Sequence, residues 1–97
     1  PYQKNIQELI SFLKEKKIQN YLKIRPILME TILYGKEINV IKNIVYELKK
    51  ASWVSDTQKI EIIRYAANIS HRLTLPNIAK TCVHSEAFLL KCLTTLL

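Results

Sequence analysis

Glycine is almost absent from this sequence, with one residue in 97, and there are only three prolines. A sheet protein of this length would need several such turn residues between its strands. Their scarcity argues against a β architecture, and long periodic segments with few breakers predict helices. Hydrophobic residues make up 48% of the chain and charged residues 24%, which is typical of a folded domain and excludes disorder.

Long hydrophobic runs are also missing. No apolar run reaches the ~18 residues of a transmembrane helix, and the N-terminus lacks the layout of a secretion signal. Cys82 and Cys92 are too few for a disulfide framework and predict reduced core thiols. We therefore expect an intracellular protein, cytoplasmic or nuclear, with no membrane contact. Pro1 suggests that the chain is a piece of a longer one.

Acidic residues are scarce, with eight against fifteen lysines and arginines, and the net charge is +7. This charge favours an acidic partner and leaves nucleic acid open as a second one. The basic residues concentrate in the N-terminal half, in a predicted basic patch of Lys14, Lys16, Lys17, Lys23 and Arg25. For the run KEKK, a solvated helix end with cations near the C-terminal dipole is the simpler interpretation.

Patterns typical of catalysis or of a metal site are absent as well. Cys82, His84, Cys92 and His71 form neither a C-x-x-C nor an H-x3-H spacing, so no zinc site is predicted. No glycine-rich loop could hold a phosphate or an oxyanion, and no feature lowers the pKa of either thiol. We expect neither an enzyme nor a cofactor, and no small-molecule substrate.

What the sequence does contain is helical periodicity. Ile6, Leu9, Ile10 and Leu13 recur at i, i+3, i+4 and i+7, the spacing of one helix face. The prediction is a single all-α domain over residues 1–97, with about six helices and no sheet. The predicted helices cover residues 2–17, Pro26 to about Tyr34, 39–50, 56–70, a short helix opened by Leu75-Pro76, and a last helix capped by Ser85.

The segment 56–70 has a clear helix start and a broad apolar surface. Ser55 and Gln58 form a capping box at its start. Apolar residues then occupy a broad surface, which indicates burial on more than one side. This helix is therefore expected at the centre of the domain.

The C-terminal region allows two interpretations, of which the first is a helix-turn-helix at about 73–97. Its spacing resembles the first helix-turn-helix of the AraC/XylS regulators, with matches at Leu73, Leu75, Ile78, Ala79, Ser85, Leu89 and Leu93. The resemblance implies a fragment of a DNA-binding transcriptional regulator, with Thr81, His84, Glu86, Ala87 and Lys91 near the groove. Against it, Glu86 and Lys91 cancel in charge, and Leu90 would face a hydrated groove.

The second interpretation is an armadillo or HEAT repeat. The phrase RYAANIS, an Asn at position 77, and the leucine-rich end resemble an armadillo repeat at Ala66, Ala67, Asn68, Ile69, Ser70, Asn77, Leu89, Leu90, Leu93, Leu96 and Leu97. Ser85 stands about where that family prefers glycine. The resemblance implies a compact armadillo- or HEAT-like helical stack that binds other proteins.

Independently, the last helix is apolar nearly all round and must be covered on more than one side. We therefore predict a non-enzymatic protein–protein interaction or scaffold domain, a subunit of a homo- or hetero-oligomer. It would bury its C-terminal helix against a partner chain, and Trp53, between two helices, would anchor the partner or plug the core. The predicted interface residues are Phe88, Leu90, Leu93, Leu97 and Trp53.

Overall fold

The structure, a computed structural model, describes residues 1–73 and 82–97. These residues form five α-helices and one 3-10 helix, with no strand among them: α1 (Tyr2–Glu15), η1 (Ile18–Lys23), α2 (Ile24–Tyr34), α3 (Glu37–Lys50), α4 (Asp56–Arg72) and α5 (Val83–Leu96). The all-α prediction is confirmed. The short helix expected at Leu75-Pro76 lies outside the described residues.

Local chemistry explains where several helices begin and end. Ser55 accepts from the backbone N–H of Gln58 at 3.1 Å, and the Gln58 side chain accepts from the Ser55 N–H at 2.9 Å, so α4 opens on the predicted capping box. α1 ends at Glu15, and its C-cap Lys16 has a left-handed backbone conformation with φ 57°. Gly35 follows α2, where a Cβ would lie 3.1 Å from the Tyr2 ring, so a larger residue would push that ring aside.

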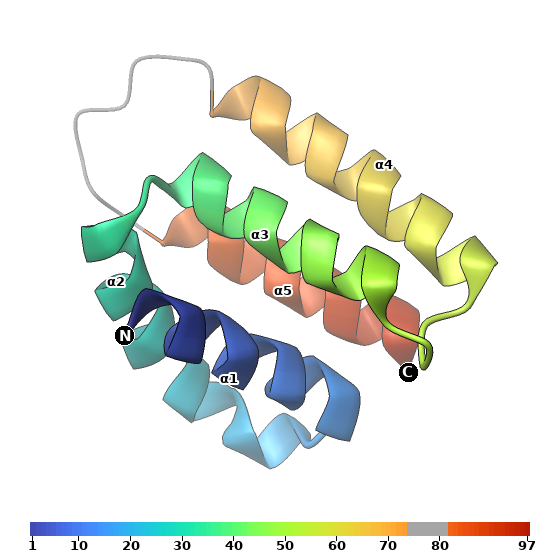
Figure 1. Cartoon of the computed structure of the whole chain (residues 1–97), viewed down its shortest axis with the longest axis horizontal. Helices are drawn as coiled ribbons and strands as arrows, with labels where there is room; N and C mark the ends of the chain where they lie inside the picture. Colours follow the sequence, from blue (N-terminus) through green and yellow to red (C-terminus); the bar gives the residue numbers. More distant parts are fainter. Residues whose placement is uncertain (74–81) are drawn as a thin grey trace.

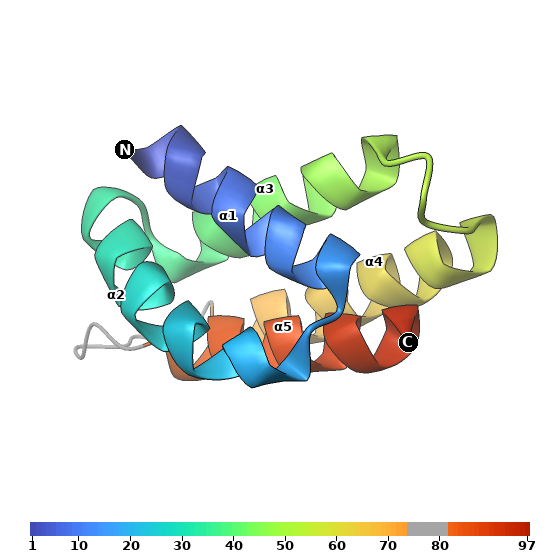
Figure 2. The same cartoon turned by 90° about the horizontal axis from the view of Figure 1, so that it is seen from below.

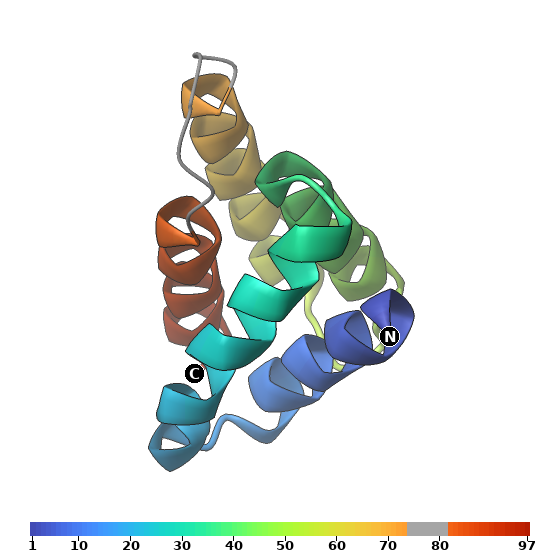
Figure 3. The same cartoon turned by 90° about the vertical axis from the view of Figure 1, so that its left-hand side faces the viewer.

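α3 and α5 pack against each other, and in Figure 1 α3 lies in front of α5 in the middle of the view. α4 lies along one edge of this pair, and α1 and α2 lie along the other, as the end view in Figure 3 shows. α5 contacts each of the other four α-helices. The fully buried side chains include Leu9, Leu28, Ile41 and Phe88, so one core joins α1, α2, α3 and α5.

The expectation that residues 56–70 form the central helix is wrong. α4 lies at the edge of the bundle and packs mainly against α3 and α5. Ile62, Ala66 and Ile69 are buried, but Ile60 is 57% exposed and Ile63 is 41% exposed. The apolar surface is as broad as the sequence indicates, but this chain covers only one side of it. None of the described helices has the length and apolar character that a membrane span requires.

The capping box gives the first testable prediction. Ser55→Ala removes the side-chain acceptor of the Gln58 N–H and should lower the free energy of unfolding by about 1 kcal/mol in urea denaturation. Ser52→Ala, in the exposed turn just before α4, is the matched control and should change it by less than ~0.5 kcal/mol. Equal effects of the two variants would contradict the role given to the cap.

Candidate partner interface

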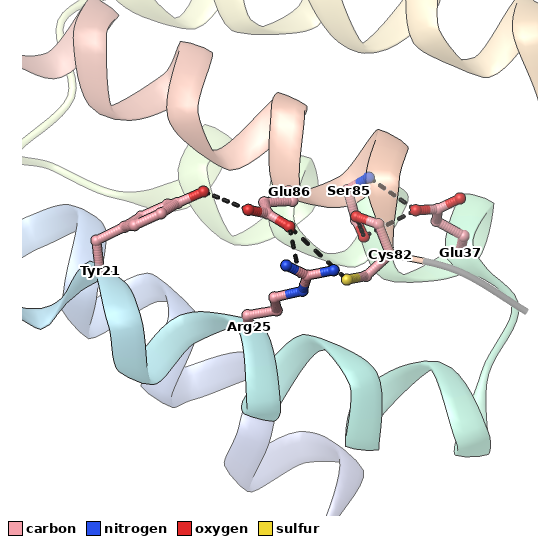
Figure 4. A network of polar contacts seen from close by, with 6 residues as sticks. All are labelled: Tyr21, Arg25, Glu37, Cys82, Ser85 and Glu86. Carbon is pink, nitrogen blue, oxygen red and sulfur yellow. Dashed lines mark hydrogen bonds and ion pairs between the residues drawn. The ribbon is translucent and has the colours of Figure 1, made fainter.

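The first turn of α5 is anchored to α3 by a buried carboxylate (Figure 4). The backbone N–H of Ser85 donates to Glu37 Oε2 at 2.8 Å, and the Ser85 hydroxyl donates to the same oxygen at 2.9 Å. Glu37 is 9% exposed and Ser85 is fully buried. A negative charge beside the N-terminal turn of a helix is also favoured by the helix dipole. Ser85 was predicted to cap α5, but the helix begins at Val83 and Ser85 lies inside its first turn.

A second set of contacts joins the same turn to η1 and α2. The Tyr21 hydroxyl donates to Glu86 Oε1, and Arg25 Nε lies 3.9 Å from Glu86 Oε2 (Figure 4). The hydrogen bond to Glu86, and then burial, raise the pKa of the Tyr21 hydroxyl. The Arg25 side chain is 71% exposed, so solvent screens its ion pair and the hydrogen bond from Tyr21 is the firmer contact.

Both thiols are buried, and the pKa of each is raised. Burial raises the pKa of the Cys92 thiol to about 12. Burial, followed by the nearby Glu86 carboxylate, raises the pKa of Cys82, whose sulfur lies 3.9 Å from that carboxylate. The thiolate is the reactive form, so neither group is poised as a nucleophile. Within residues 1–73 and 82–97, no cluster of three or more His, Cys, Asp or Glu side chains could hold a metal ion.

α5 carries a row of exposed, mostly apolar residues on the side that faces away from the core. We call it the α5 stripe, and it consists of Val83, Ala87, Leu90, Thr94 and Leu97. The successive spacings are four, three, four and three residues, the spacing of a helix seam that packs on another helix. Val83 is 62% exposed, Leu90 43% and Leu97 69%. η1, which lies beside α5, exposes Ile18 and Leu22 as well (Figures 2 and 3).

The five predicted interface residues lie in three different environments. Phe88 is fully buried and Leu93 is 5% exposed, so both belong to the core and leave almost no surface for a partner. Leu90 and Leu97 lie on the α5 stripe. Trp53 is half-buried against the core in the turn between α3 and α4. Val83, Ala87 and Thr94, the other members of the α5 stripe, were not among the predicted interface residues, although the steps of three and four residues along the stripe can be read from the sequence.

The predicted basic patch does not form one uniformly positive surface. Lys14, Lys16, Lys17 and Lys23 are exposed around the end of α1 and along η1. Lys23 lines an open groove between α1 and the segment η1–α2, together with Lys4, Glu8 and Glu15, so positive and negative charges balance there. Arg25 is directed at Glu86.

The family described as the replication factor C subunit 3, C-terminal domain, matches residues 2–97. No curated protein and no solved structure matches the chain significantly. The chain therefore belongs to the family of the C-terminal domain of replication factor C subunit 3.

This match over nearly the whole chain overturns both resemblances drawn from the sequence. The armadillo and HEAT assignment is wrong, and so is the AraC/XylS helix-turn-helix. The positions that suggested them include Ala66, Ile69, Leu89 and Leu93, which are buried, and such packing positions recur wherever two helices meet. Among the residues assigned to a DNA groove, Glu86 contacts Tyr21, and Thr81 lies outside the described residues. Asn77, which belonged to the repeat pattern, lies outside them as well.

The anchor of α5 can be tested by charge removal. Glu37→Gln keeps the shape of the side chain but weakens the acceptor of the two Ser85 hydrogen bonds. We expect the free energy of unfolding in urea to fall by about 1.5–3 kcal/mol. Glu30→Gln is the matched control, because it neutralises a solvent-exposed carboxylate on α2. It should change the free energy of unfolding by less than ~0.5 kcal/mol. An unchanged stability in Glu37→Gln would exclude the anchoring role.

The raised pKa of Cys92 predicts a dependence of stability on pH. The thiol ionises near 9 in the unfolded chain and near 12 in the folded chain, so the folded state holds the proton more tightly. This contribution to stability is complete below about pH 9 and is lost as the pH rises toward 12. A Cys92→Ala variant should therefore show a shallower loss of unfolding free energy over that range. Parallel curves for the two proteins would show that burial of Cys92 has no such effect.

Proposed function

We propose that this domain assembles its subunit into replication factor C, a clamp-loader complex, by packing against the corresponding domains of other subunits. In this proposal residues 1–97 act as one all-helical unit that binds protein and catalyses nothing. Family membership supports the assembly role, since the family's description names a subunit. A role in replication also implies a location inside the cell, with its DNA.

The observation that carries the proposal is the α5 stripe. The opposite side of α5 is buried, with Phe88, Leu89 and Leu96 each at most 1% exposed, so the helix is fixed in the core. Its outer side nevertheless keeps large apolar groups in water. Complete burial of a fully exposed leucine contributes roughly 1.5–3 kcal/mol. Leu90 is 43% exposed and Leu97 is 69% exposed, so a partner that covers them would gain a part of that free energy from each.

The geometry of the stripe favours one kind of partner. Alternating steps of four and three residues form a straight seam along one helix, which a second helix can follow over the same length. Apart from Thr94, the five stripe residues are apolar, and none carries a charge. The expected partner is therefore a helix with its own apolar seam from another subunit. Trp53 remains a predicted anchor at the edge of this contact.

The assembly proposal is tested in the complex. Leu90→Asp combined with Leu97→Asp should reduce co-purification of this subunit with the other replication factor C subunits, with affinity at least tenfold lower. The reason is that each carboxylate would be buried unpaired in the seam. Circular dichroism should show unchanged helix content, because both side chains point to solvent within this chain.

Ile60→Asp is the matched control, since Ile60 is an aliphatic residue of similar exposure on the outside of α4. It should leave assembly intact. If Ile60→Asp disrupts the complex and the double variant does not, the partner covers α4 instead of the α5 stripe. If neither has an effect with correctly folded protein, the stripe is not an assembly surface.

A further inference from the structure

α3 presents a row of polar and aromatic side chains on the other side of the molecule from the α5 stripe. Asn39, Lys42, Tyr46 and Lys49 recur at i, i+3, i+7 and i+10, and Lys50 adjoins them. All five are exposed. We call them the α3 row. In Figure 1, α3 lies in front of α5 between α4 and α1, and Figure 2 shows α3 and α5 at opposite sides.

The α3 row is strongly positive. It contains three lysines, and the nearest acidic residue on the helix, Glu47, lies 3.4 Å from Lys50 Nζ. Across the described part of the chain, neither Lys42 nor Lys49 has a carboxylate within ion-pair distance. These two residues are separated by about two helical turns, or ~10 Å along the axis, so together they can contact two points on an extended polyanion.

Tyr46 places an exposed aromatic ring among these cations. The residue is 60% exposed, and Lys50 Nζ lies 4.4 Å from the ring centroid. This cation covers one side of the ring and still leaves much of the side chain open. Single-stranded nucleic acids bind to this combination, because cations follow the phosphates while bases stack on exposed aromatic rings.

We propose that the α3 row is a binding site for single-stranded nucleic acid. Lys42 and Lys49 contact phosphates, Tyr46 stacks on an unpaired base, and Asn39 offers an amide to a base edge or a phosphate. A protein partner fits less well, because protein interfaces centre on apolar side chains and the row offers no aliphatic residue. Because α3 and α5 face opposite ways, this site and the α5 stripe can be occupied together.

The test measures binding of a fluorescent oligothymidylate to the full chain by anisotropy over a range of salt concentrations. Lys42→Glu with Lys49→Glu should weaken binding at least tenfold and make the salt slope shallower by about 1.4, because two phosphate contacts are lost. Tyr46→Ala should weaken binding roughly five- to a hundredfold, as expected for one stacked base, and leave the salt slope nearly unchanged. Tyr46→Phe should bind like the native chain.

Lys16→Glu with Lys17→Glu is the matched control, because it changes the net charge equally but lies at the end of α1, away from the α3 row. It should retain most of the binding. Equal losses of affinity in the two charge-reversal variants, or no effect of Tyr46→Ala, would show that the attraction is non-specific and would contradict the proposed site.

Binding of polyglutamate as tight as that of oligothymidylate would instead identify an acidic protein as the ligand. The Leu90→Asp and Leu97→Asp variant should still bind the oligonucleotide, which separates this site from the assembly surface.

Discussion

Burial of the Glu37 carboxylate is favourable only because Ser85 supplies two hydrogen bonds to one of its oxygens. That requirement fixes the first turn of α5 against the first turn of α3. Once this turn is placed, the 3.6-residue period decides the direction of every later side chain of α5. Phe88, Leu89 and Leu96 then enter the core, and Leu90 and Leu97 stay outside. The direction in which the α5 stripe faces is therefore a consequence of the polar contact in the first turn of the helix.

The pairing of α3 with α5 also separates two chemistries on the surface. Each helix turns its apolar face toward the other, so their outer faces point in opposite directions (Figure 2). The outer face of α5 is apolar and nearly uncharged, whereas that of α3 is basic with one exposed ring. An apolar seam suits a helix of another subunit, and a basic row with an aromatic ring suits a polyanion with stacking bases. The two partners proposed for these faces would therefore not compete for the same surface.

Local patterns predicted the helices well where the chemistry is local. The Ile6–Leu13 periodicity and the Ser55–Gln58 capping box depend only on residues a few positions apart, and both lie in helices where expected. The prediction that α4 is the central helix was wrong. A broad apolar surface indicates that a helix can be covered, but it does not indicate whether the same chain or another one covers it. The repeat and helix-turn-helix resemblances were wrong for a related reason. The spacing of buried leucines indicates that a helix is packed, but it does not identify the protein family to which the helix belongs.

By itself, the sequence determined the all-helical class, most helix boundaries and the excess of positive charge, because each follows from composition or from contacts within one helix. The tertiary structure alone decided that Phe88 is core while Leu90 is surface, that Ser85 binds Glu37 in place of capping α5, and that Lys42, Tyr46 and Lys49 face away from the stripe. These outcomes depend on contacts between residues as far as 48 positions apart. No short-range pattern in the chain encodes which distant side chain will be the neighbour.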